Sequence, residues 1–108
     1  MINDLAPIVL FVYNRPWHTE QTLNALMQNE LASESTLYIF ADGPKKVATD
    51  EHIQKITEVR QIIKSKQWCK EVIIVESEEN KGLANSIISG VTEVINKHEK
   101  VIVLEDDL

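Results

Sequence analysis

The sequence predicts an α/β fold, with a mainly parallel sheet covered by helices on both faces, in the order strand, helix, strand, helix, strand, helix, strand. Three observations predict it. Four short apolar runs alternate with three longer stretches of helical spacing. The apolar runs show no polar alternation, which is typical of strands that are covered on both faces. Helical connections between strands favour right-handed crossovers, which make the strands parallel.

The first part of the chain supplies a strand, a helix and a second strand. Pro7 to Tyr13 is rich in β-branched and aromatic residues, which favour strands. Pro16 follows at a position that the first turn of a helix tolerates. This helix places three apolar residues on one face, namely Leu23, Leu26 and Met27. Thr36 to Ala41 then repeats the strand character.

The second helix begins after Thr49 or Asp50, because either side chain can cap the first turn. Its period predicts an inward face made of Ile53, Ile56, Val59 or Arg60, and Ile63. Val72 to Val75 is the third predicted strand.

The third helix has the most regular apolar spacing. One stripe contains Ala84, Ile87, Ile88, Val91 and Ile95. Gly90 lies near this stripe, and the absence of a side chain there allows the helix to approach the sheet closely. Val101 to Leu104 forms the fourth strand.

Composition indicates an ordinary globular protein and excludes several functions. The 108 residues form one domain, 1–108, and 44% of them are hydrophobic. The formal net charge is −6 and no basic face is present, so we expect no binding to nucleic acid. No apolar run approaches the ~20 residues of a membrane span, and the first residues do not form a signal peptide. We therefore expect a cytoplasmic protein.

Some reactive or aromatic residues have no motif around them. Cys69 is the only cysteine, so it forms no internal disulfide, and we expect it to be a small buried residue rather than a nucleophile. Trp17 and Trp68 are expected to pack at the ends of elements. The three histidines share no spacing and are expected at the surface: His18, His52 and His98.

Ligands of parallel sheets bind beyond the carboxyl ends of the strands, so the residues after each strand form the candidate site. The four strands are followed by Asn14-Arg15-Pro16, by Asp42-Gly43-Pro44, by Glu76 to Gly82, and by Glu105-Asp106-Asp107. One rim of the sheet therefore gathers an arginine, an aspartate, an Asn-Lys-Gly turn and an acidic triplet.

Each of the first three groups has an ordinary and a functional interpretation. Arg15 suits a base carbonyl or a phosphate, but it also suits a solvated turn. Asp42 begins Asp-Gly-Pro, which is common turn chemistry. Asn80-Lys81-Gly82 suits an anion at the start of a helix, or simple capping, and Lys81 is either a phosphate contact or a solvated cation.

The acidic triplet Glu105-Asp106-Asp107 is either a solvated acidic end or a metal site. The three carboxylates repel one another, and a shared cation relieves that repulsion. Because an apolar strand comes directly before them, they are expected at the rim of the sheet. Hard oxygen ligands suit Mg²⁺ or Mn²⁺, with a diphosphate completing the coordination shell.

Three other phosphate-binding folds are excluded by missing residues. A dinucleotide-binding turn needs a glycine cluster after its first strand, where this chain has Tyr13-Asn14-Arg15-Pro16. The phosphate loop with Gly-Lys-Ser/Thr is absent from the sequence. A receiver domain needs an acidic pair at the position of Asn14 and Arg15.

Four segments, in this order, resemble the amino-terminal, nucleotide-binding half of GT-A fold glycosyltransferases, of the family-2 type and especially the N-acetylglucosaminyltransferase I branch. They are Pro7 to Pro16, Ile39 to Gly43, Asn80 to Ala84 and Val101 to Leu108. The resemblance implies a three-layer Rossmann-like fold. It also implies metal-dependent, inverting transfer of a sugar from a nucleotide-diphospho-sugar donor, expected to be UDP-linked, to a saccharide or other hydroxyl acceptor.

The resemblance further implies roles for individual residues. Tyr13, Asn14 and Arg15 would border the nucleoside, with Arg15 close to the base. Asp42 would accept a hydrogen bond from the imino group of a uracil-like base. Asn80 and Gly82 would line the donor pocket.

The acidic triplet stands where the family has its Asp-x-Asp motif. Glu105 replaces the first aspartate, Asp106 would reach the ribose, and Asp107 would bind Mn²⁺ or Mg²⁺. The catalytic base and the acceptor-binding half are expected beyond Leu108, so we expect this chain to bind the donor without transferring the sugar.

Two other functions stay open. One is a catalytically silent α/β module that forms subunit contacts, such as a homo-oligomer, through an uncovered surface. The other is a nucleotidyltransferase, although such enzymes usually have a Gly-rich basic loop after the first strand and this chain does not.

Overall fold

The computed structural model describes residues 6–30, 32–98 and 100–105. Along the chain the elements are β1 (Ile8–Val12), α1 (Pro16–Met27), the 3-10 turn η1 (Ala32–Glu34), β2 (Thr36–Ala41), α2 (Asp50–Lys64), β3 (Glu71–Glu76), α3 (Leu83–His98) and β4 (Ile102–Glu105). The strands form one sheet in the order β3-β2-β1-β4, and every pair is parallel. The predicted fold class is therefore confirmed, and η1 is the element that the sequence did not indicate.

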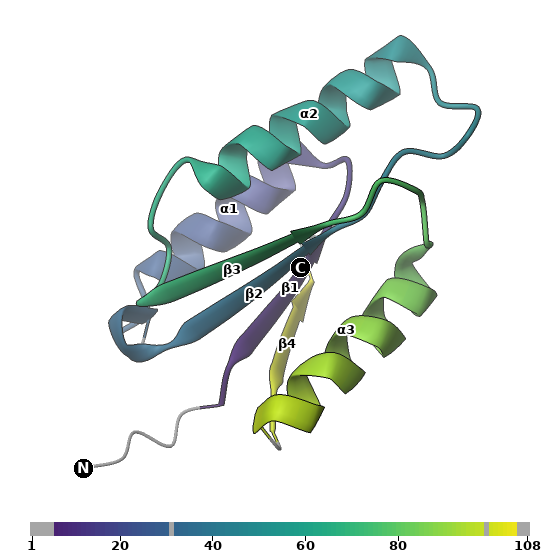
Figure 1. The fold of residues 1–108 in the computed structure, drawn as a ribbon. Coiled ribbons are helices and arrows are strands. Elements are labelled where there is room, and N and C mark those ends of the chain that lie inside the picture. Colours follow the sequence, from purple (N-terminus) through teal and green to yellow (C-terminus); the bar gives the residue numbers. More distant parts are fainter. Residues whose placement is uncertain (1–5, 31, 99, 106–108) are drawn as a thin grey trace.

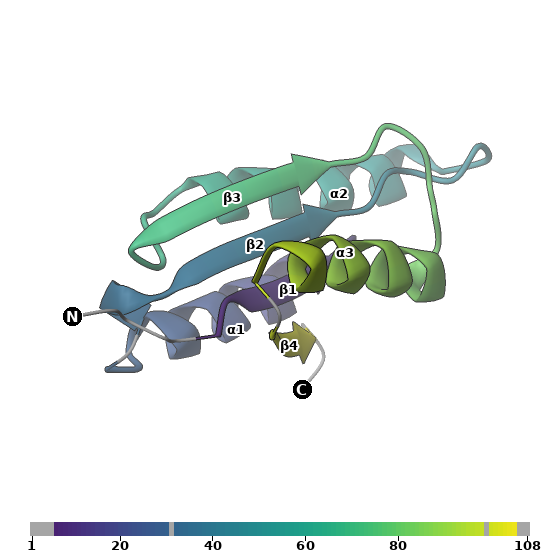
Figure 2. The same cartoon turned by 60° about the horizontal axis from the view of Figure 1, so that its bottom comes forward.

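The sheet is the middle of three layers. α1 and α2 lie on one face and α3 lies on the other (Figures 1 and 2). Alternate residues of β1 explain this arrangement, because Ile8, Leu10 and Val12 belong to the core under α1 and α2. Val9 and Phe11 belong to the core under α3. All five residues of β1 are apolar and buried, because both faces of this central strand are covered.

α2 begins where its capping residue predicts. The Oγ1 atom of Thr49 accepts a hydrogen bond from the backbone N–H of His52 at 3.1 Å. Ile56 and Ile63 are buried as predicted, and so is Val59. Ile53 is 44% exposed, so its predicted inward position is wrong. The buried face of α2 starts one turn later, at Ile56.

α3 approaches the sheet closely at Gly90, which faces the aromatic rings of the strands. A Cβ atom at Gly90 would lie 2.8 Å from Cε1 of Phe11 and 3.2 Å from Cδ2 of Phe40. The predicted close approach is therefore confirmed.

The side of α3 that faces the sheet contains Gly90 and Val94, which are buried, and also Ile87 and Val91, which are partly buried as predicted. Ile88 is 65% exposed, Ile95 is 40% exposed and Ala84 is exposed, so the prediction that these three face the sheet is wrong. Ile88 directly follows Ile87, and Ile95 directly follows Val94. The 100° step between successive residues therefore turns both isoleucines to the side of the helix.

The predictions for Cys69 and Trp68 are confirmed. Both residues are buried, and Nε1 of Trp68 donates a hydrogen bond to the carbonyl of Ile63 at 3.0 Å. Burial raises the pKa of the Cys69 thiol, which keeps it protonated and unreactive. Trp17 is 65% exposed on the first turn of α1, so the prediction that it packs is wrong. No helix in the described ranges is long and apolar enough to cross a membrane.

Candidate functional site

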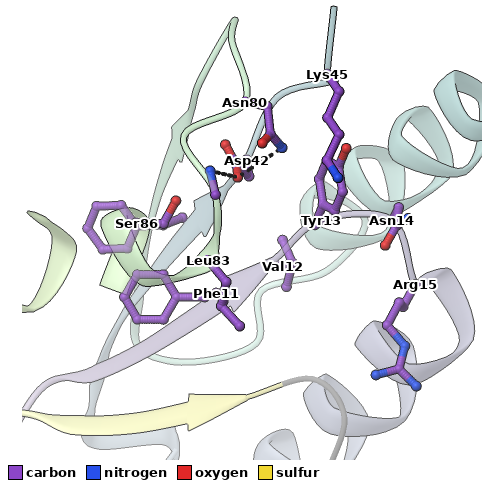
Figure 3. Close-up of a pocket in the computed structure, with 12 residues that line it drawn as sticks. Phe11, Val12, Tyr13, Asn14, Arg15, Asp42, Lys45, Asn80, Leu83 and Ser86 are labelled. Carbon is purple, nitrogen blue, oxygen red and sulfur yellow. Dashed lines mark hydrogen bonds between the residues drawn. The ribbon is translucent and has the colours of Figure 1, made fainter. Parts of the chain in front are cut away.

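A cavity of about 320 Å³ opens at the carboxyl ends of β1 and β2, beside the start of α3 (Figure 3). Six of the residues lining it are predicted from the sequence to border a nucleotide: Tyr13, Asn14, Arg15, Asp42, Asn80 and Gly82. The structure therefore brings together three segments that are distant in the sequence. Sequence reasoning missed the other lining residues, which are Phe11, Val12, Phe40, Lys45, Leu83 and Ser86.

Asp42 is held at the cavity wall by hydrogen bonds from the protein itself. Its Oδ1 atom accepts from the backbone N–H groups of Gly43 and Lys81, both at 2.9 Å. Its Oδ2 atom accepts from the backbone N–H of Gly82 at 3.0 Å and from Nδ2 of Asn80 at 3.3 Å. A carboxylate has about four lone-pair positions, so these bonds fill its capacity as an acceptor. Asp42 therefore joins the end of β2 to the turn before α3.

Two glycines allow this connection, for different reasons. Gly82 has a φ of 81°, in the left-handed region that favours glycine. Gly43 is in a tight contact instead, because a Cβ atom there would lie 2.6 Å from the carbonyl oxygen of Ser77. Asn80 adds a bond from Nδ2 to the carbonyl of Gly43 at 3.0 Å, which uses its second amide hydrogen.

Arg60 supports the same wall from α2. Its Nη2 atom donates to the carbonyl oxygens of Asp42 at 3.2 Å and Ser77 at 2.7 Å. Its Nη1 atom lies 3.5 Å from Oε1 of Glu76, at the end of β3. The half-buried guanidinium therefore fixes the ends of β2 and β3 relative to each other. The sequence predicted either Val59 or Arg60 at the inward position of α2. In the structure Val59 is buried in the core, and Arg60 also points inward, towards the ends of β2 and β3.

Tyr13 connects the end of β1 to the start of α2. Its hydroxyl lies 2.8 Å from Nε2 of His52, within hydrogen-bond distance. Burial raises the pKa of the Tyr13 phenol above its ordinary value, and the charge of Asp42 acts in the same direction. Hydrogen bonds involving Lys45 and Asn80 oppose this shift without cancelling it. Tyr13 therefore presents a neutral phenol to the cavity.

Arg15 lines the cavity, and its guanidinium points away from Asp42 (Figure 3). Its Nη2 atom donates to Nε2 of His18 at 2.8 Å. Arginine has no acceptor, so this contact makes Nε2 the acceptor and leaves the proton of His18 on Nδ1. All three histidines, predicted only as surface residues, thus have side-chain partners, since Nε2 of His98 lies 2.7 Å from the hydroxyl of Tyr38.

Two phenylalanines give the cavity an aromatic floor, defined by Phe11 of β1 and Phe40 of β2. Their ring centroids are 5.4 Å apart and their planes differ by 21°, so the rings are stacked. Phe11 is only 4% exposed and Phe40 is partly buried in the core under α3, so these rings mainly form a rigid apolar base for the cavity.

The acidic triplet begins next to this floor. Glu105 is the last residue of β4, and its backbone is in register with Phe11. The side chain of Glu105 and the residues Asp106 and Asp107 lie outside what the structure describes, so the roles expected of them stay predictions. Within the described ranges, no group of three or more His, Cys, Asp or Glu side chains is placed to hold a metal ion.

Neither the known protein-family models nor the curated proteins give a match to this chain. Its function is therefore inferred from the residues and geometry of the cavity.

Proposed function

We propose that this chain is the donor-binding part of a metal-dependent glycosyltransferase and that its cavity holds the nucleotide of a nucleoside-diphosphate sugar, expected to be UDP-linked. One observation carries the proposal. Six residues selected from three separate sequence segments line a single cavity at the carboxyl ends of parallel strands. Ligands of open α/β sheets bind at this edge.

The strand order supports an orientation for the nucleotide. β4 lies beside β1, and Glu105 is in register with Phe11 of the aromatic floor. β4 therefore ends at the side of the cavity farthest from β3. We assign the diphosphate to this side and the base to the side formed by Asp42 and Asn80.

The proposal assigns the divalent ion, Mn²⁺ or Mg²⁺, to Asp107, with Glu105 and Asp106 beside it. Such an ion, when bound, supplies positive charge to the departing diphosphate. The described residues contribute binding and orientation. The Asp42 network holds the turn before α3, and the aromatic floor keeps the ends of β1 and β2 rigid beneath the cavity. The proposal assigns no residue of this chain to deprotonation of the acceptor.

Isothermal titration calorimetry with UDP, with Mn²⁺ or with EDTA, tests the proposal. We expect binding with Mn²⁺, and a loss of affinity of about tenfold or more in EDTA or in the Asp107→Asn variant. Asp50→Asn is the matched control, because Asp50 is an exposed aspartate at the start of α2, outside the residues that line the cavity. Absence of binding for UDP and every other nucleoside diphosphate would contradict the proposal.

A different observation favours the second candidate, a silent interaction module. In the described part of the chain β4 pairs with β1 alone, and its side chains Ile102 and Val103 are 50% and 42% exposed. An exposed apolar edge strand is a site for pairing with another chain. Light scattering on the full chain tests this candidate. Self-association that Ile102→Lys abolishes would support it, and a monomer that binds nucleotide would exclude it.

A further inference from the structure

Lys45 is the cationic residue of the cavity that sequence reasoning did not consider. It lies in the loop between β2 and α2, and Figure 3 shows its side chain extending towards Tyr13 at the cavity. In the described ranges its ammonium group forms no ion pair with a carboxylate. It is therefore available to a ligand. We propose that Lys45 selects the base of the bound nucleotide and favours uracil over cytosine, an inference that rests on the proposed function.

The strand order places Lys45 at the base end of the cavity. β4, which leads to the acidic triplet, lies on one side of β1, and β2 lies on the other. Lys45 follows the end of β2 by a few residues. A nucleotide whose diphosphate lies beside β4 therefore directs its base towards Asp42, Asn80 and Lys45.

Two other polar groups at this end, the carboxylate of Asp42 and the amide hydrogens of Asn80, are already occupied. The carboxylate of Asp42 accepts four hydrogen bonds from the protein, which fill its lone-pair positions. Both amide hydrogens of Asn80 are used, one on Asp42 and one on the carbonyl of Gly43. The ammonium of Lys45 is thus the charged group at the base end whose hydrogen-bonding capacity is open.

The chemistry of an ammonium group decides which base it accepts. Lysine offers three donors and no acceptor, so its partner must be an oxygen or nitrogen lone pair. With position 4 of the base at Lys45, uracil presents the O4 carbonyl oxygen there, whereas cytosine presents an amino group; the O2 carbonyl, which both bases carry, would give no selection. With cytosine the donors of Lys45 would face the hydrogens of that amino group and remain unpaired. A site that requires a hydrogen bond discriminates strongly against a ligand that cannot make it.

Calorimetric titration of the full chain with UDP and with CDP, both with Mn²⁺, tests this inference. The variants are Lys45→Met, which removes the donors but keeps the length of the side chain, and Lys45→Arg, which keeps donors. Lys46→Met is the matched control, because Lys46 is the adjacent exposed lysine and does not line the cavity. Thermal unfolding of each variant confirms that it is folded.

We expect the wild-type chain to bind UDP about tenfold or more tightly than CDP. Lys45→Met should weaken UDP binding by about tenfold and CDP binding by less than about twofold, so that the preference is lost. Lys45→Arg and Lys46→Met should retain the preference. The inference is overturned if wild type shows no preference, or if Lys45→Met weakens both nucleotides equally. Failure of wild type to bind any nucleoside diphosphate would instead overturn the proposed function itself.

Discussion

Replacement of Asp42 by asparagine should destabilise the protein strongly, even without any ligand. The substitution keeps one oxygen, which can still accept from the backbone N–H groups of Gly43 and Lys81. The second oxygen becomes an NH₂ group that faces two donors, the N–H of Gly82 and Nδ2 of Asn80. Two hydrogen bonds to a charged acceptor are lost in a residue that is only 9% exposed.

Each bond to a charged group contributes about 1.5–3 kcal/mol, and the bond from Asn80, at 3.3 Å, belongs at the lower end of that range. The free energy of unfolding should therefore fall by about 3 kcal/mol, which corresponds to a decrease of roughly 15 °C in Tm for a domain of this size.

Urea denaturation followed by circular dichroism measures this loss. Asp50→Asn is the matched control, because it removes the same charge from an exposed position at the start of α2 and should cost no more than about 0.5 kcal/mol. If Asp42→Asn costs no more than this control, the four hydrogen bonds do not hold the turn before α3, and the account of Asp42 is wrong.

Two further predictions concern packing and pH. Gly90→Ala should reduce the free energy of unfolding by about 1–2 kcal/mol, because the new Cβ atom would lie 2.8 Å from Phe11. Ser89→Ala, at the adjacent exposed position, should change it by less than about 0.5 kcal/mol, and equal effects at the two sites would contradict the close approach of α3. Burial raises the pKa of Tyr13 and of Tyr38 above the ordinary value of 10.0, so the folded state keeps both phenol protons at a pH where the unfolded state loses them. This stabilisation is present below pH 10.0 and is lost as the pH rises through the raised pKa values. The double variant Tyr13→Phe, Tyr38→Phe should therefore show a shallower decline in urea-measured stability above pH 10.0, and an unchanged decline would contradict the effect of burial.

The fold class was predictable because its signals are local. The run from Leu37 to Ala41 has no polar alternation, and the helix starts at Pro16 and after Thr49 depend on single residues. The orientation of α3 was less predictable. Ile88 and Ile95 fit an apolar stripe as well as the true inward residues do, and only the contact of Gly90 with the aromatic rings determines which side faces the sheet.

The location of the site was predictable from topology, whereas its internal bonding was not. Parallel strands bring their carboxyl ends together, so the residues that follow them were sound candidates for one cavity. The bonds of Asp42 to Lys81 and Gly82 cross about 40 residues of sequence, and Asp-Gly-Pro by itself indicates only a turn. Lys45 has no local pattern around it. The role proposed for it depends on the hydrogen bonds that already occupy Asp42 and the amide hydrogens of Asn80, and only the three-dimensional structure shows these bonds.

Mapping UDP binding on the full chain by ¹⁵N–¹H NMR, with Mg²⁺ present, tests directly whether this cavity binds a nucleotide. We expect UDP to shift the backbone amides of Tyr13, Asn14, Gly43 and Gly82 and the side-chain amide of Asn80, while amides on the outer surface of α2 stay unchanged. Absence of any shift, or shifts confined to β4 and the exposed part of α1, would contradict the assignment of this cavity as a nucleotide site.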